Sequence, residues 1–258
     1  MKDLFWRDTG SGRPLVFVHG GFLDHRMWDD QIPVFARDHR VIAHDARGHG
    51  RSANASGPFR HGDDLAAILR HLDTGPAVLV GLSMGGGIAI DVAMDHPELV
   101  EAVIVSGAGT FESHFADPWT IKVLEDFGTA IASGAAETAI EIFMRFTSGP
   151  SRTLEDVDPE VVRRLYEMLR GSFAKHTAGE PKWMLPSPDT WARAAQIGVP
   201  VHAINGAVDS PDHLEMAERL VNIVGTGTTT TIDGTAHYPN MERPQEFNAA
   251  LQDMLRTL

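Results

Sequence analysis

The stretch Ala77-Val78-Leu79-Val80-Gly81-Leu82-Ser83-Met84-Gly85 decides the fold of this chain. It begins as a short apolar strand pattern, turns at a serine between two glycines, and runs on into the helix pattern of residues 86–93. A Gly-x-Ser-x-Gly turn between a strand and a helix is typical of a nucleophile elbow. An ordinary Gly/Ser turn is the competing interpretation. We predict that Ser83 is a catalytic nucleophile and that the helix after it directs free N–H groups toward developing negative charge.

The composition favours one globular domain, with or without an insertion. The 258 residues are 43% hydrophobic and 22% charged, which is enough to bury a large core. The chain contains no cysteine, so disulfides, thiolate catalysis and cysteine-bound zinc are excluded. Its 22 Lys and Arg residues against 35 Asp and Glu residues give a net charge of −13 without a basic run, which disfavours binding to nucleic acid.

The chain carries no visible signal for a membrane or for export. Residues 1–8 lack the apolar core of a signal peptide. No apolar run approaches the roughly 20 residues that a membrane-spanning helix needs. We therefore expect a cytoplasmic protein that binds neither membranes nor nucleic acid, while the sequence leaves the oligomeric state open.

Strand and helix patterns alternate along most of the chain. Strands are predicted at residues 4–7, 15–18, 41–44, 77–80, 100–105, 200–204 and 228–232, with a turn at residues 9–14. Helices are predicted at residues 28–35, 63–72, 211–224 and 244–258, and directly after Ser83. This alternation indicates an α/β fold with a mostly parallel, doubly wound sheet covered by helices on both faces.

The segment from residue 111 to residue 195 breaks this alternation. It is mostly helical in pattern, at residues 119–124, 137–146 and 161–169, and holds no convincing strand. We expect a helical cap inserted into the fold and packed over the carboxyl edge of the sheet. The core would then comprise residues 1–110 and 196–258, with the cap at residues 111–195.

Two downstream residues match the needs of a catalytic serine. A serine hydroxyl requires a base to accept its proton and an acid to orient that base. Asp209 and His237 each follow a predicted strand, and loops at the carboxyl ends of parallel strands converge on one edge. We predict the triad Ser83–His237–Asp209. The alternatives are Asp209 as a helix cap, Asp212 as the acid, and His237 as a core histidine.

The intermediate of acyl transfer also needs two N–H donors for its oxyanion. Met84, the residue after the nucleophile, is predicted to supply one. The glycine-rich loop His19-Gly20-Gly21-Phe22 is expected to supply the other, with Gly21 as first choice and Phe22 as second. We expect His19 to bond to the backbone and to brace this loop, and a simple turn is the competing interpretation.

The sequence points to no cofactor and no metal. Gly85-Gly86-Gly87 is not a phosphate-binding loop, because no Gly-Lys-Ser/Thr follows it. No dinucleotide fingerprint follows the first strand. A metal site is an open alternative only at His19, His25, His44 and His49, which stand near Asp24 and Asp45 in the sequence.

Together these motifs resemble the α/β-hydrolase superfamily. The resemblance rests on His-Gly-Gly at 19–21, Asp-x-Arg-Gly-His-Gly-x-Ser at 45–52, Gly-x-Ser-x-Gly-Gly at 81–86, Gly-x-x-Asp at 206–209 and Gly-x-x-His at 234–237. It implies an eight-stranded sheet with a cap after strand six, although the first edge strand looks missing or shortened here. Within the superfamily, the chain is similar to the serine esterase, enol-lactonase and cofactor-free haloperoxidase group.

The resemblance implies a hydrolase of a carboxylic ester or lactone. The expected substrate is a small, largely apolar molecule that forms an acyl-enzyme on Ser83. Hydrolysis of a carbon–carbon bond or of a thioester by the same residues is the close alternative. A lyase or a receptor that uses the pocket for binding is the more distant one. The serine nucleophile counts against relatives that use aspartate at this position.

Overall fold

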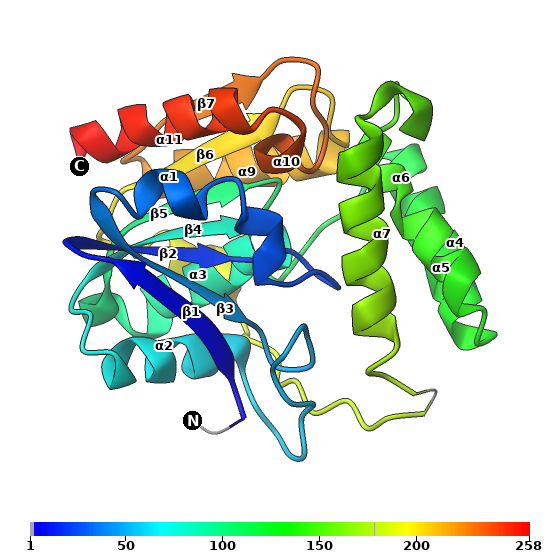
Figure 1. Cartoon of the computed structure of the whole chain (residues 1–258), viewed down its shortest axis with the longest axis horizontal. Coiled ribbons are helices and arrows are strands. Elements are labelled where there is room, and N and C mark those ends of the chain that lie inside the picture. Colours follow the sequence, from blue (N-terminus) through cyan, green and yellow to red (C-terminus); the bar gives the residue numbers. More distant parts are fainter. Residues whose placement is uncertain (1–2, 178) are drawn as a thin grey trace.

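The structure is a computed structural model that describes residues 3–177 and 179–258, so Met1, Lys2 and Ala178 lie outside the description. Its centre is a seven-stranded sheet in the order β1-β3-β2-β4-β5-β6-β7 (Figure 1). The strands are β1 (Phe5–Gly10), β2 (Arg13–Val18), β3 (His39–Asp45), β4 (Ala77–Leu82), β5 (Val100–Ser106), β6 (Val201–Gly206) and β7 (Thr229–Ile232). Only β1 is antiparallel to its neighbour. The predicted α/β class with a mostly parallel sheet is therefore confirmed.

Helices cover both faces of the sheet. One face carries η1 (His25–Trp28), α1 (Ile32–Phe35), α10 (Pro239–Glu242) and α11 (Pro244–Thr257). The other carries α2 (His61–His71), α3 (Met84–Asp95), α8 (Thr190–Ala194) and α9 (Pro211–Val224), with the short η2 (Pro97–Leu99) between α3 and β5. This is the arrangement expected for buried parallel strands, which need apolar cover on both sides.

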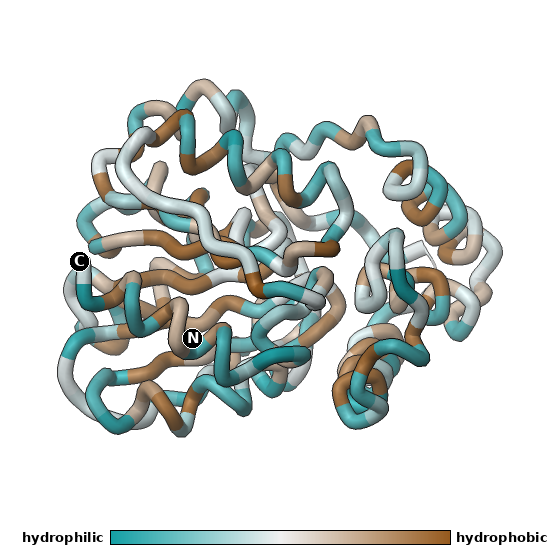
Figure 2. The backbone as a smooth tube through the Cα atoms, turned by 90° about the horizontal axis from the view of Figure 1, so that it is seen from above, coloured by the Kyte–Doolittle hydropathy of each residue, from teal (hydrophilic) through white to brown (hydrophobic). Residues whose placement is uncertain are grey.

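Successive side chains of the central strands enter different cores. In β2, Leu15 and Phe17 belong to the core beneath α11, whereas Val16 and Val18 belong to the core beneath α3. This follows from the two-residue period of a strand. In Figure 2 the hydrophobic strands, coloured brown, run through the middle of the part of the molecule that carries both marked termini. Burial on both faces explains why these strands read as continuous apolar runs.

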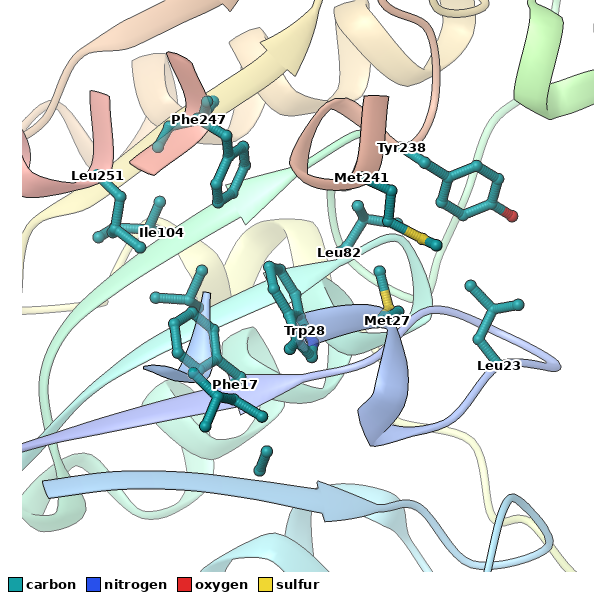
Figure 3. Close-up of a cluster of buried hydrophobic side chains, with 14 of the residues drawn as sticks. Phe17, Leu23, Met27, Trp28, Leu82, Ile104, Tyr238, Met241, Phe247 and Leu251 are labelled. Atoms are coloured by element: carbon teal, nitrogen blue, oxygen red, sulfur yellow. The ribbon is translucent and has the colours of Figure 1, made fainter. Parts of the chain in front are cut away.

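Aromatic and sulfur-containing side chains fill the core beneath α11 (Figure 3). Trp28 stacks on Phe17, with ring centroids 4.8 Å apart, and lies 6.0 Å from Phe247. Met27 and Met241 continue the cluster toward Tyr238. Because Tyr238 directly follows His237, this core also supports the loop that carries the predicted catalytic histidine.

Five helices and one 3-10 helix lie between β5 and β6. They are α4 (Pro118–Ala132), α5 (Ala136–Phe143), α6 (Arg145–Ser148), η3 (Leu154–Asp156), α7 (Pro159–Phe173) and α8. Figure 1 shows α4 to α7 grouped together on one side of the sheet. Val161, Leu165 and Leu169 of α7 join the core beneath α11. No helix in the described part of the chain is long and apolar enough to cross a membrane.

The structure corrects several predicted boundaries. The expected helix at 28–35 is two short pieces, because Pro33 lacks an N–H and fits only in the first turn of α1. The expected helix at 137–146 divides at Met144 into α5 and α6. The strand β1 extends to Gly10, which shortens the predicted turn. The family resemblance implied eight strands with the first edge strand missing or shortened. Among the described residues one strand, β1, precedes β2, and the sheet has seven strands.

Candidate active site

Ser83 lies on a strained turn at the carboxyl end of β4. Its backbone dihedrals are φ 54° and ψ −118°, which non-glycine residues rarely adopt. Such a conformation costs about 1–3 kcal/mol and persists only where the surrounding structure holds it. The Ser83 N–H donates to the Ser106 carbonyl at 2.8 Å. Gly85 has no room for a side chain, because a Cβ there would collide with the Val18 carbonyl. The sharp turn predicted from the sequence is present.

Asp209 and His237 meet although they lie on separate loops. Asp209 follows β6 and His237 follows β7. The Nδ1 of His237 donates to Oδ2 of Asp209 at 2.8 Å, and both side chains are buried. Because Nδ1 carries the proton of the neutral ring, Nε2 is the nitrogen left to accept another.

The electrostatics of this pair favour a neutral base beside a carboxylate. Burial opposes ionisation of Asp209, but its electrostatic attraction to the His237 and His213 rings and their hydrogen bonds outweigh burial and hold the pKa of Asp209 below the usual range. Burial lowers the pKa of His237 below 6.5, although the attraction of Asp209 acts in the other direction. At neutral pH His237 is therefore uncharged, which is the state that a general base needs.

An ion pair holds the loop that carries His237. Arg152, which follows α6, donates to the Gly234 carbonyl at 2.5 Å and pairs with Glu242 at 2.8 Å. Glu242 in turn accepts the Ala236 N–H at 2.8 Å. These contacts hold the backbone at Gly234 and at Ala236, directly before His237. The segment after α6 therefore helps to position the loop that carries the His237 ring.

Gly107 lies between Ser83 and the Asp209–His237 pair. It follows Ser106, the acceptor of the Ser83 N–H, and has φ +54°. A Cβ on Gly107 would lie 2.8 Å from the His237 ring and 2.9 Å from Oδ2 of Asp209. The three predicted triad residues are thus gathered at one edge of the sheet. Within the described residues Ser83 Oγ makes no hydrogen bond to His237, and such bonds often tighten only when substrate binds.

The predicted oxyanion donors face each other across the same edge. Met84 begins α3, where first-turn N–H groups have no helical acceptor. A Cβ on Gly21 would lie 3.8 Å from Cβ of Met84. Phe22 has φ +59°, which turns its backbone into the left-handed region. The loop after β2 therefore lies opposite the start of α3, where the prediction needs it.

His19 braces this loop, as predicted. Its Nε2 accepts the Ala46 N–H at 2.9 Å, and its Nδ1 lies 2.8 Å from the Gly20 carbonyl. Because Nε2 accepts, Nδ1 carries the proton and donates to Gly20. Burial lowers the pKa of His19, which keeps the ring neutral in this role. The expected bonding of His19 to the backbone is confirmed.

Two cavities adjoin these residues. A cavity of about 110 Å³ beside the elbow is lined by Ser83, Met84, Phe111, Phe115, His213 and Met216 among others. A second, apolar cavity of about 370 Å³ lies between the loop after β2 and the cap, and its lining includes Phe22, Phe127, Ile131 and Phe173. The ring of Phe22 lies 5.2 Å from Phe143 and 5.3 Å from Phe173. The helices between β5 and β6 thus place apolar surface next to the loop after β2.

The sequence left two alternatives open, Asp212 as the catalytic acid and a metal site near Asp24 and Asp45, and in the structure these side chains make other contacts. The carboxylate of Asp212 accepts the N–H groups of Ala116 and Asp117, not a histidine. Asp24, His25 and Asp45 have ligand atoms within 4.8 Å of one another. However, Asp45 already accepts from the backbone N–H and from Nδ1 of His25, and Asp24 forms a bidentate pair with Arg26 of η1. These side chains serve the turns that contain them.

The sequence analysis missed His213. Its Nδ1 lies 3.3 Å from Oδ1 of Asp209, and its ring stacks on His237 with centroids 4.3 Å apart. The available signal was the spacing Asp-x-x-x-His at a helix start, where residues i and i+4 lie on one face. Asp209, His213 and His237 could together hold a metal ion, since their ligand atoms lie within 4.8 Å of one another.

Comparisons with known proteins agree with this geometry. A family model described as alpha/beta hydrolase fold matches residues 13–244. The 3-oxoadipate enol-lactonase 2 of Acinetobacter baylyi is 30% identical over 254 residues, which cover 95% of this chain and 90% of that protein. The non-heme haloperoxidase of Rhodococcus erythropolis is 30% identical over 192 residues, covering 69% and 68%. The solved structure of Est816, described as an N-acyl homoserine lactone degrading enzyme, superposes with a TM-score of 0.78 at 25% identity, covering 97% and 96%.

Proposed function

Because this chain belongs to the alpha/beta hydrolase fold family, we propose that it is a serine hydrolase that cleaves a carboxylic ester or a lactone. One observation carries the proposal. Ser83 occupies a strained turn at the same sheet edge as a buried, hydrogen-bonded Asp209–His237 pair. Backbone strain of this kind concentrates at functional sites, and the pair has the protonation states that a base and its orienting acid require.

In the proposed mechanism Ser83 Oγ attacks the carbonyl carbon while His237 Nε2 takes its proton. Asp209 keeps the proton of the resting imidazole on Nδ1 and stabilises the imidazolium that forms. His237 then gives the proton to the leaving alkoxide, and the acyl group remains on Ser83. Water, activated by His237, attacks the acyl-enzyme and releases the acid. The residues need no metal or cofactor for these steps.

The oxyanion of each tetrahedral intermediate would bind the Met84 N–H and a donor from the loop after β2. Gly21 was the first choice from the sequence, and it does face Met84. The backbone of Phe22 favours the second choice, because a left-handed conformation at a large aromatic residue costs roughly 1–2 kcal/mol and needs a compensating role. We therefore assign Phe22 as the second donor and Gly21 as the residue that gives it room.

The substrate we propose is a small, largely apolar ester or lactone. The apolar cavity of about 370 Å³ beside Phe22 supports this choice, because its aromatic lining suits an apolar acyl group. We propose that residues 111–195 act as the cap over a core made of residues 1–110 and 196–258. The enol-lactonase relative and the lactone-degrading Est816 are named for lactones, which favours a cyclic or acyclic ester over other acyl compounds.

A substrate panel tests this proposal. Esters of two chain lengths, a γ-lactone, a thioester and a vinylogous diketone are compared at one pH, with Ser83→Ala as the matched control. We expect turnover of esters or lactones that the Ser83→Ala variant loses. Preferential cleavage of the diketone or the thioester would replace the proposed substrate class. Binding without turnover would make the protein a receptor, and a reaction that persists in Ser83→Ala would remove the nucleophile.

A further inference from the structure

The carboxylate of Asp209 is shared by two histidines. His237 Nδ1 donates to Oδ2 at 2.8 Å, and His213 Nδ1 lies 3.3 Å from Oδ1. The Ser210 N–H donates to the same Oδ1 at 2.7 Å. A buried carboxylate needs such a set of donors to remain charged. His213 is the one donor side chain in this set that the proposed mechanism does not use.

His213 is also packed directly against the proposed base. Its ring and the ring of His237 are stacked, with 27° between their planes. Phe146 of the cap lies 5.4 Å from His213 and 5.8 Å from His237, so one aromatic ring touches both. Phe115 meets His213 edge-on at 6.2 Å. These contacts leave His213 with 8% of its surface exposed and fix the orientation of its ring.

The start of α9 brings His213 to the carboxylate of Asp209 and to the cavity that Ser83 lines. Ser210 caps this helix and accepts the backbone N–H of His213 at 3.3 Å. The side chain then reaches back to Asp209, four residues earlier. The same side chain lines the cavity of about 110 Å³ that contains Ser83. His213 therefore adjoins every member of the proposed triad.

We propose that His213 is a positioning residue of this hydrolase: its Nδ1–H holds Asp209 so that Oδ2 faces His237. The inference rests on the proposed function. When Ser83 attacks, its proton moves to His237, and the negative charge of Asp209 stabilises the new imidazolium. A carboxylate that is held by a second donor keeps its orientation toward His237 through this step, and the stacked ring of His213 keeps the His237 ring in place.

The test compares kcat and KM for p-nitrophenyl butyrate at one pH in two variants. His213→Gln keeps an amide donor toward Asp209, whereas His213→Phe keeps the ring stack but has no donor. His202→Gln is the matched control, because His202 is a buried histidine of β6 that bonds to Thr228 outside the site. Melting temperatures of all variants show whether each of them is folded.

We expect His202→Gln to match the wild type in kcat and KM. His213→Phe should lose about tenfold or more in kcat with KM changed by less than about twofold, since a hydrogen bond to a charged group is removed. His213→Gln should lose less, because its amide can replace the donor. An unchanged kcat in a folded His213→Phe variant overturns the inference, as does a His213→Gln variant that loses as much kcat as His213→Phe.

Ser83→Ala separates this inference from the proposed function. If Ser83→Ala is inactive and the His213 variants match the wild type, only the role of His213 is wrong. If Ser83→Ala keeps wild-type turnover, the proposed function fails, and the role of His213 fails with it.

Discussion

Lowering the pH from 7.5 to 5.5 should destabilise the fold through buried histidines. His19, His44, His49 and His61 form a cluster at the loop of residues 45–52, with successive ring centroids 5.2–6.2 Å apart. Burial lowers the pKa of His44 and His49 to about 3 and that of His61 to about 4. The Nδ1 atoms of His44 and His61 are buried without a hydrogen-bond partner, so neither ring has an acceptor ready for a second proton.

The magnitude follows from proton linkage. The unfolded chain binds protons at its histidines near pH 6.5, whereas folded His44, His49 and His61 do not, so their stability contribution is present above pH 6.5 and is lost as the pH falls toward 4. One unit below the unfolded pKa, each of the three groups contributes a loss of roughly 1–2 kcal/mol, or about 4 kcal/mol together. Burial raises the pKa of Asp91 to about 6, which acts in the opposite direction. Protonation of Asp91 in the folded state returns about 1 kcal/mol, leaving a net loss of about 3 kcal/mol.

Urea unfolding at pH 7.5 and 5.5 measures this loss, and a melting temperature lower by roughly 6–12 °C should accompany it. His61→Phe should reduce the pH-dependent part of the free energy of unfolding by roughly 1–2 kcal/mol, whatever it does to stability at pH 7.5. His71→Gln is the matched control, because His71 lies exposed at the end of α2 and should leave the pH dependence unchanged. Equal free energies of unfolding at the two pH values would refute the reasoning.

Three further predictions concern the candidate site. Asp209→Asn should lower kcat by about 10³–10⁴-fold through the wrong His237 tautomer, while Asp212→Asn should cost far less, and the reverse order would show the wrong acid. Activity should be lost through protonation of His237 only below pH 6.5, because burial lowers the pKa of His237. The kcat/KM of His213→Gln should therefore stay level from pH 8 to 6.5 and fall below that, and a midpoint above pH 6.5 would contradict this prediction. Among cap residues, Phe143→Ala should change the preference between a short and a long ester more than Trp183→Ala does, since Phe143 packs on Phe22; equal losses on both esters with a lower melting temperature would make Phe143 a structural residue.

The sheet could be predicted closely because its strands are continuous apolar runs. The helix α9 was predicted with its observed bounds, because Pro211 opens it and Gly225, at φ 74°, ends it. The division of the helix at Met144 could not be predicted, since neither glycine nor proline marks it. Local sequence signals thus set most element boundaries, and they fail where tertiary packing alone bends the chain.

The predicted site residues could be proposed from sequence motifs, but the residues that hold them in place could not. Ser83, Asp209 and His237 each follow a strand, so the topology brings their loops to one edge. The pair of Arg152 with Glu242 joins residues 90 positions apart, and its existence depends on how the cap packs. His213 was missed for a similar reason, because its spacing from Asp209 gains meaning only once His237 is known to lie against both.

The identity of the nucleophile tests the central claim most directly. The protein is treated with a fluorophosphonate until hydrolysis of p-nitrophenyl butyrate stops, and the adduct is located by peptide mass mapping. We predict one adduct, on Ser83, formed in proportion to the loss of activity and absent from Ser83→Ala. An adduct on another residue, or full turnover by protein that is labelled at Ser83, would contradict the account.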